Sequence, residues 1–386
     1  MSEEIVQLTA ADFEDAMDFL NLVFGAHRPH DFERLLPAAY QANDESMACN
    51  YAVRTDGRIR GIVGMFPMAL QVGRTTLKVA GVGGVSTHPR SRGAGYMRAL
   101  MNHCVRLMRE QGYHLSYLGG QRQRYQYFGY ERCGQVAHYS LNQPNLRHCF
   151  GAEDPPGIRF EPLDPQDTER MTAARGQHDA QPIYCLRQPG NFHNHLRSWY
   201  NRPHVALDSG GSLVGYLVAT ASGDRVTELV TDDDETALRL LRAWVTDHTE
   251  HEVTIALPAY RAGLARLLGR YCERIGVQPS GNWQVFDWVG VLDALFKARP
   301  LSGPLLEGEV VVAIEGVGAV CLSVRDGQPG CVLTEEEPAV RCDALTALRL
   351  FFGPLTPSQV MALPAAAARL DQWCPLPLFW PAQDGV

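Results

Sequence analysis

The sequence predicts an α/β chain in which mixed, mostly antiparallel sheets are flanked by helices in more than one domain. Its 386 residues exceed what one ordinary hydrophobic core accommodates. With 45% hydrophobic and 20% charged residues, the composition is that of a globular protein able to bury several cores. Strand and helix patterns also alternate along the whole chain. We therefore expect domains at residues 1–150, 151–300 and 301–386.

The first expected domain begins with a capped amphipathic helix, because Thr9 precedes a run to Phe24 whose apolar side chains recur near helical spacing. Strand patterns follow at residues 50–54, 60–66, 68–72 and 77–87. The segment Thr55-Asp56-Gly57 between the first two is a hairpin turn signal. The start of the chain therefore predicts a helix followed by antiparallel strands.

A second helix is expected directly after a short glycine-rich turn, between Gly93 and Gly112. Its apolar side chains repeat at three- and four-residue intervals, at Met97, Leu100, Met101, Cys104, Leu107 and Met108. A strand at 113–118, a short helix near Tyr125 and a last strand at 135–141 complete this domain. The Pro- and Gly-rich stretch 142–167 is interpreted as a linker.

The rest of the chain repeats the mixed order and then ends in a small α+β unit. Between residues 167 and 300 we expect strands at 205–207, 213–219, 225–230 and 253–257, and helices at 235–248 and 261–268. The strand ending at Val230 leads into Thr231-Asp232-Asp233-Asp234-Glu235 instead of a glycine-rich turn. These acids suit a helix start but would repel a pyrophosphate. After residue 300 we expect strands at 309–314, 319–324 and near Val332, and a helix at 343–352.

The segment that predicts chemistry is Val85-Ser86-Thr87-His88-Pro89-Arg90-Ser91-Arg92-Gly93-Ala94-Gly95-Tyr96-Met97, where a strand meets a helix through a turn. Unpaired N–H groups at a helix start, together with the helix dipole, can hold a pyrophosphate. Glycines let the phosphate approach the backbone closely.

This segment resembles motif A of the GNAT acetyltransferases, in which a strand meets an Arg/Gln-x-x-Gly-x-Gly/Ala loop. Two registers fit, Arg92-x-x-Gly95-x-Met97 and Arg90-x-x-Gly93-x-Gly95. The resemblance implies acetyl-CoA as co-substrate. It implies that the backbone of Val85, Ser86 and Thr87 pairs with the pantetheine, and that loop amides of Arg92, Gly93, Ala94, Gly95, Tyr96, Met97 and Arg98 hold the pyrophosphate.

A second segment, Tyr125-Gln126-Tyr127-Phe128-Gly129-Tyr130-Glu131, resembles a stretch that many GNAT enzymes carry after their fifth strand. The resemblance implies that Tyr125 protonates the departing thiolate of the coenzyme. Tyr127, Phe128 and Tyr130 are interpreted as core aromatic residues.

The domain order is similar to that of the enhanced intracellular survival (Eis) acetyltransferases, which have tandem GNAT folds and a sterol-carrier-like C-terminal domain. That resemblance implies that the terminal carboxylate of Val386 is the general base. The Pro- and aromatic-rich tail from Pro375 to Pro381 can dock this end, although a frayed tail is an alternative. The resemblance also implies a homo-oligomer.

For the acceptor, the resemblance implies a small amine such as an aminoglycoside or polyamine, bound near Phe24, Asp31, Glu33, Asp44 and Glu45. Surface acids with no such role are the plainer interpretation of these carboxylates. A protein or peptide lysine N-acetyltransferase and a non-catalytic acetyl-CoA sensor remain alternatives.

Charge, cysteine spacing and hydropathy exclude several classes of partner. The formal net charge is -8 and there is no Lys/Arg block, so we expect no nucleic-acid partner. The ten cysteines are scattered singly, which favours a reducing, cytoplasmic setting. The sequence has no run apolar enough for a membrane span, so no membrane partner is expected. The histidines His27, His30, His193 and His195 lack partners at metal-ligand spacing, so no metal is expected.

Overall fold

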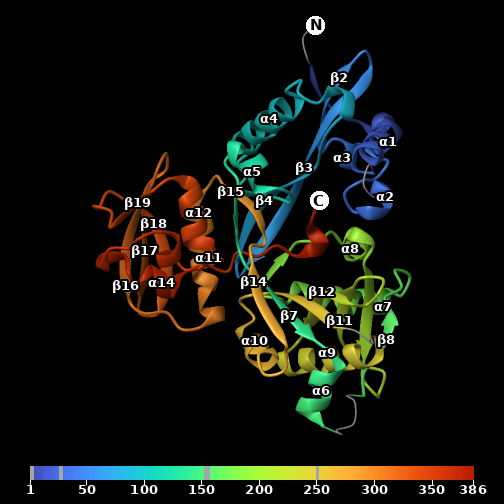
Figure 1. The fold of residues 1–386 in the computed structure, drawn as a ribbon, viewed down its shortest axis with the longest axis vertical. Coiled ribbons are helices and arrows are strands. Elements are labelled where there is room, and N and C mark those ends of the chain that lie inside the picture. The colour runs from blue at the N-terminus through green and yellow to red at the C-terminus, as the bar shows by residue number, and fades with distance from the viewer. Residues whose placement is uncertain (1–3, 26–28, 152–156, 249–251) are drawn as a thin grey trace.

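The computed structural model describes residues 4–25, 29–151, 157–248 and 252–386. Three lobes are built around an eight-stranded, a seven-stranded and a four-stranded sheet. In Figure 1 the first lobe lies at the top, the second below it and the third to the left. The C-terminus reaches the centre, between the first and second lobes. The predicted fold class, tandem mixed sheets with a smaller α+β unit, is confirmed.

The first lobe contains the eight-stranded sheet, in the order β1-β2-β3-β4-β5-β15-β6, with β9 paired to β3. Its strands are β1 (Ile5–Gln7), β2 (Asn50–Thr55), β3 (Arg58–Val72), β4 (Thr75–Thr87), β5 (Leu115–Leu118), β6 (Glu131–Cys133), β9 (Ile183–Cys185) and β15 (Gly281–Val285). Its helices are α1 (Phe13–Phe24), α2 (Phe32–Leu35), α3 (Asp44–Met47), α4 (Tyr96–Glu110) and α5 (Arg122–Tyr125).

Local sequence signals explain the start of this lobe. Thr9 forms a capping box with Asp12 ahead of α1, as the sequence predicts. Asp56 and Gly57 both have positive φ, 51° and 73°, so the β2–β3 hairpin has the turn geometry that matches strand twist. The helix α4 begins at Tyr96, later than the predicted Gly93, because Gly93 and Gly95 have φ of 87° and 90° and cannot belong to a right-handed helix.

The second lobe contains the seven-stranded sheet, in the order β14-β7-β13-β12-β11-β10-β8. Its strands are β7 (Val136–Leu141), β8 (Arg159–Pro162), β10 (Arg202–Leu207), β11 (Leu213–Ala219), β12 (Arg225–Thr231), β13 (Val253–Pro258) and β14 (Arg274–Gln278). Its helices are α6 (Gln143–Phe150), α7 (Thr168–Asp179), α8 (Phe192–Leu196), α9 (Asp234–His248) and α10 (Ala262–Leu268).

The two large sheets exchange one strand each. The strand β7 directly follows the first lobe in sequence, but it pairs with β13 and β14 of the second sheet. Reciprocally, β15 lies between β5 and β6 of the first sheet. Alternation of side chains identifies a strand but not the sheet it joins. The placement of strand 135–141 in the first domain is therefore wrong, and β15 was not predicted.

The predicted linker at 142–167 is also wrong, because it contains α6 and β8. Asn142 caps α6 by accepting a hydrogen bond from the Asn145 amide, and Pro144 stands in the first helical turn. Pro and Gly here mark a helix start and end; they do not mark an unstructured connection. Residues 152–156 lie outside the described part of the chain.

The third lobe packs its helices against a four-stranded sheet in the order β18-β17-β16-β19. Its elements are α11 (Trp288–Ala298), β16 (Gly308–Ile314), β17 (Gly318–Arg325), β18 (Gln328–Thr334), β19 (Val340–Cys342), α12 (Ala344–Phe352), α13 (Pro357–Val360) and α14 (Leu370–Trp373). Its apolar core is continuous with one end of the first sheet through Trp283, Trp288 and Phe351. The third lobe therefore anchors the start of the C-terminal tail beside the first lobe.

The strand exchange predicts that residues 1–150 do not fold alone. Without β15, the strand β6 loses the strand it pairs with in the described part of the chain and β5 loses a neighbour, while β7 has no sheet to join. We expect a fragment of residues 1–150 to aggregate or to unfold without cooperativity, measured by size exclusion and thermal circular dichroism. A monomeric fragment with a sharp unfolding transition would contradict this.

Candidate active site

The site begins where β4 and β5 part. These parallel strands pair from Val79↔Leu115 to Val82↔Leu118, and β4 then continues to Thr87 without β5. On its other side β4 stays paired with β3 as far as Thr87. The stretch from Gly83 to Thr87 therefore presents one free backbone edge, which an extended ligand can pair with as an added strand.

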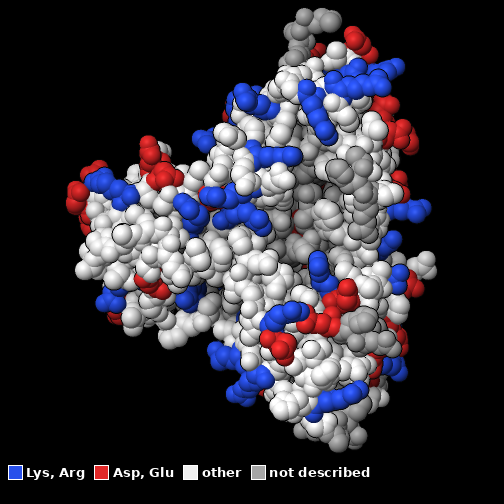
Figure 2. All heavy atoms as spheres, viewed as in Figure 1, with Lys and Arg blue, Asp and Glu red and all other residues white. Residues whose placement is uncertain are grey.

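The loop after β4 presents backbone donors at the start of α4. Gly95 is the N-cap, and the first helical hydrogen bond runs from the Ala99 amide to the Gly95 carbonyl. The amides of Tyr96, Met97 and Arg98 therefore have no helical acceptor. Gly95, which directly precedes the helix, belongs to both registers of the motif, so this geometry fits either one. Figure 2 shows Lys and Arg side chains on the face of the first lobe around α4 and α5.

A buried, unsatisfied hydroxyl adds a further donor beside the free edge. Among the described residues the Tyr40 hydroxyl has no hydrogen-bond partner. It lies against Gly84, where an added Cβ would be 2.6 Å from the oxygen. Gly84 has φ of 59°, so both its backbone and its surroundings require glycine. The edge, the loop amides and this hydroxyl together fit an extended, phosphate-bearing acyl carrier such as acetyl-CoA.

Tyr125 lies at the end of α5, close to where β5 ends. Its ring packs over Gly120, at which an added Cβ would be 3.0 Å from Cε2. Only 9% of the residue is exposed, and among the described residues its hydroxyl makes no hydrogen bond. Burial raises the pKa of the Tyr125 phenol above its ordinary value, so the group stays protonated at neutral pH.

The rest of the Tyr125 segment holds α5 in place. Glu131, 1% exposed, accepts hydrogen bonds from Arg122 Nη2 at 2.7 Å and from Gln126 Nε2 at 3.0 Å. Tyr130 is fully buried and its hydroxyl lies 2.7 Å from Ser116 Oγ, as expected of a core aromatic residue. Tyr127 departs from that expectation, since it is 89% exposed.

The C-terminus of the chain enters the same place from the opposite direction. A Cβ at Gly83 would lie 2.5 Å from the carboxyl carbon of Val386 and 3.0 Å from its oxygen. At Gly81 a Cβ would meet the Val386 side chain at 2.9 Å. The terminal carboxylate therefore rests on β4 at the residue following its last pair with β5, and the two glycines make room for it.

The tail before Val386 is held by both large lobes. Trp380 stacks on Tyr117 of β5 with ring centroids 5.0 Å apart, and its Nε1 donates to the Asp384 carbonyl at 3.0 Å. Gln383 Nε2 donates to Thr227 Oγ1 of β12 at 2.7 Å. These contacts show a docked tail and not a frayed end.

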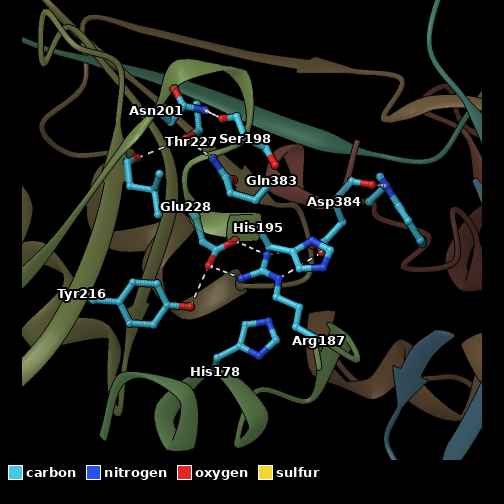
Figure 3. A network of polar contacts seen from close by, with 12 residues as sticks. His178, Arg187, His195, Ser198, Asn201, Tyr216, Thr227, Glu228, Gln383 and Asp384 are labelled. Atoms are coloured by element: carbon cyan, nitrogen blue, oxygen red, sulfur yellow. Dashed lines mark hydrogen bonds and ion pairs between the residues drawn. The ribbon is translucent and has the colours of Figure 1, made fainter. Parts of the chain in front are cut away.

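A buried charged network fixes Asp384, as Figure 3 shows. The Arg187 guanidinium, with no side-chain exposure, donates to Asp384 Oδ2 at 2.7 Å and to Glu228 Oε2 at 2.6 Å. His195 Nδ1 lies 3.2 Å from Asp384 Oδ1, and the Tyr216 hydroxyl donates to Glu228 Oε1 at 2.6 Å. Removing one partner of a buried ion pair of this kind typically costs about 3–5 kcal/mol.

The pKa shifts in the network follow from these contacts. Burial alone would raise the pKa of Asp384, but the charge of Arg187 and hydrogen bonds from His195 and Arg187 outweigh it and hold that pKa well below its usual range. The pKa of Glu228 is lowered in the same way, mainly by Arg187 against the effect of burial. Both carboxylates are therefore ionised at neutral pH.

A pocket of about 630 Å³ opens beside the terminal carboxylate. This volume suits a small-molecule ligand. Its wall combines residues of the first lobe, of the segment after β9 and of the tail: Leu36, Ala38, Ala39, Gln41, Asn43, Glu45, Ser46, Cys49, Phe66, Pro67, Met68, Ala69, Cys185, Leu186, Arg187, Gln188, Pro189, Asn191, His195, Ser198, Gln383, Asp384, Gly385 and Val386.

The predicted acceptor residues lie largely elsewhere. Phe24 packs against Phe32 with ring centroids 5.0 Å apart. Asp31 caps α2 and its backbone bonds to the Tyr200 hydroxyl, and Glu33 is exposed. None of these three is among the residues that line the pocket, whereas Glu45 is. A role for Phe24, Asp31 and Glu33 in acceptor binding stays a prediction.

Other candidate sites in the described residues are few. No group of three or more His, Cys, Asp or Glu side chains there is arranged to hold a metal ion. His193 bonds to the Leu163 carbonyl and His195 to Asp384, while His27 lies outside the described residues. No helix in the described ranges is long and apolar enough to cross a membrane.

Comparison with known proteins identifies the first lobe. The family model of the acetyltransferase (GNAT) domain matches residues 4–133. This part of the chain is a GNAT acetyltransferase domain. The resemblance stated from its two motifs is thereby confirmed. No curated protein matches the full sequence significantly.

Solved structures extend the likeness of fold to the whole chain. Eis1 from Mycobacterium abscessus is 16% identical with a TM-score of 0.64, covering 95% of this chain and 96% of that one. A GCN5-related N-acetyltransferase from Kribbella flavida is 21% identical, with 97% of each chain covered and a TM-score of 0.66. A probable N-acyltransferase of Enterococcus faecalis V583, of unknown function, is 15% identical, with 98% of each chain covered and a TM-score of 0.68.

Sequence reasoning found the two motifs of the GNAT domain but missed the residues that hold its tail. Arg187, Glu228 and Asp384 stand in unrelated segments, and no local pattern singles them out. The one available signal was an acid, Asp384, in an otherwise uncharged end to the chain after Asp371.

The loop geometry predicts how the GNAT domain binds its co-substrate. Gly95→Ala forces a side chain into a left-handed conformation, so the amides at the start of α4 should move. We expect the Kd for acetyl-CoA to rise about tenfold, equivalent to about 1.4 kcal/mol, by calorimetry. Gly57→Ala is the matched control, because Gly57 also has positive φ in open space but lies in the β2–β3 turn. Equal affinities for the two variants would contradict a role for this loop.

Proposed function

We propose that the chain is an acetyl-CoA-dependent N-acetyltransferase that moves an acetyl group directly to a primary amine of a small cationic acceptor, aminoglycoside- or polyamine-like. The observation that carries the proposal is the Val386 carboxylate resting on Gly83, where β4 and β5 part and the pocket begins. It stands between the edge that fits the acyl carrier and a pocket of suitable size for the acceptor.

The proposed chemistry assigns one proton to each end of the site. The acceptor attacks as a neutral amine, after its alkylammonium form, with a pKa of about 10.4, has released one proton to solvent. The Val386 carboxylate accepts the second proton of that nitrogen, directly or through water, as the nitrogen bonds to the carbonyl carbon and the carbon–sulfur bond breaks. Tyr125 donates its phenolic proton to the departing thiolate, and its raised pKa keeps that proton available.

Charge in the pocket supports a cationic acceptor. Glu45 and the C-terminal residue Val386 both line the pocket. The single positive charge of Arg187 is shared between the carboxylates of Asp384 and Glu228, so these three side chains together carry a net negative charge. The ten cysteines are unpaired, which supports a cytoplasmic setting. Assembly into a homo-oligomer stays a prediction.

The proposed activity is tested by following thiol release from acetyl-CoA over aminoglycosides, polyamines and lysine peptides. Release with the small amines supports the proposal. Release with lysine peptides alone would favour a protein or peptide acetyltransferase. Tight acetyl-CoA binding with no release on any amine would favour a non-catalytic sensor.

The role of Tyr125 is tested on an amine acceptor found in that screen. Tyr125→Phe keeps the packed ring and removes only the hydroxyl, so thermal stability should be unchanged. We expect kcat to fall roughly 100-fold, as is typical when a general acid is lost. Tyr127→Phe, at an exposed ring, serves as the control. If kcat for Tyr125→Phe equals that of the unaltered enzyme, Tyr125 is not the acid.

A further inference from the structure

The second lobe repeats the parted strands of the first lobe. The parallel strands β12 and β13 pair only at Arg225↔Thr254 and Val226↔Ile255, and β12 then continues to Thr231 alone on that side. Val226 thus corresponds to Val82 of β4, and Thr227 to Gly83. Each lobe therefore has a free strand edge that begins one residue after its last parallel pair.

The free edge of β12 is not followed by a loop of exposed amides that could bind a phosphate. The helix α9 follows β12 after two residues, and Asp233 accepts the Thr236 amide at 2.7 Å. Asp234 pairs with Arg261 at 2.7 Å. Carboxylates thus occupy the place that exposed loop amides take in the first lobe, and they would repel a pyrophosphate.

The C-terminal tail of the chain lies against this free edge of β12 instead. Gln383 donates to Thr227, the first residue beyond the pairing, and Asp384 is joined through Arg187 to Glu228, the second. Phe379 and Pro381 line a small cavity with residues of β12 and β13. Two residues after Asp384, Val386 rests on the equivalent position of the first lobe, Gly83.

We propose that the parted strands of the second lobe serve as a receptor for the C-terminus, and that Arg187, Thr227 and Glu228, the tail-binding site, position the Val386 carboxylate at Gly83. The inference rests on the proposed function of that carboxylate. Arg187, which contacts the tail, and Asp384, which is part of it, are positioning residues, because they act through the Val386 carboxylate.

Asp384→Asn is the most direct variant, because it leaves the buried Arg187–Glu228 pair intact and removes only the charge on the tail. The control is Asp234→Asn, which breaks the Arg261 pair of the same lobe without contacting the tail. Should Asp384→Asn fail to fold, Gln383→Ala removes one neutral hydrogen bond and should act in the same direction with a smaller effect.

The first readout does not depend on activity. Carboxypeptidase digestion followed by intact mass measures how often the tail leaves its site. We expect Asp384→Asn to lose Val386 at least about tenfold faster than the unaltered chain, because the charge-assisted bonds that hold the tail are lost. The Asp234→Asn variant should be trimmed at the unaltered rate. Equal trimming of all three proteins would overturn the proposal.

The second readout is kinetic and compares Asp384→Asn with a chain lacking Val386. Positioning predicts that Asp384→Asn lowers kcat but leaves the KM for acetyl-CoA unchanged. It also predicts that the double variant is no slower than the deletion alone, since both changes act through one carboxylate. Additive losses would overturn the positioning role.

The two proposals fail in different ways. If deletion of Val386 leaves kcat intact, the carboxylate is not the base, whereas fast trimming of Asp384→Asn still establishes the receptor. If the deletion lowers kcat but Asp384→Asn is trimmed and turns over like the unaltered enzyme, the tail-binding site is wrong and the proposed base stands.

Discussion

The arrangement of the site depends on one buried guanidinium. Arg187 lies between Glu228 of β12 and Asp384 of the tail, and none of the three is appreciably open to water. In such surroundings each carboxylate requires the Arg187 cation, because an unpaired buried ion is far costlier than an exposed one. Arg187 therefore holds its own segment, β12 and the tail together.

Because Arg187 fixes the tail in place, the first and second lobes both contribute to one site. Both large sheets contain a parallel pair that parts, but only the first is followed by a loop with exposed amides. The exchange of β7 and β15 fixes the lobes relative to each other, so the tail can touch both openings at once. The division of roles then follows from local chemistry. Glycines and amides in the first lobe suit an acyl carrier, and acids in the second do not.

Much of this fold was predictable because its signals are local. The capping box at Thr9, the Asp56-Gly57 turn and the apolar repeat of α4 each specify structure within a few residues. The Gly95 loop and Tyr125 were found for the same reason. The sheet that β7 joins and the partners of Arg187 were not predictable, because pairing across 41 and 197 residues leaves no periodic trace in the sequence.

The central claim, that the C-terminal carboxylate is the base, is tested most directly by changing that group alone. A semisynthetic chain ending in Val386 carboxamide keeps the length, the tail contacts and the shape of the terminus but cannot accept the proton. We expect kcat on a confirmed amine to fall roughly 100-fold or more while the KM for acetyl-CoA is unchanged. A carboxamide enzyme with the kcat of the unaltered protein would contradict the claim.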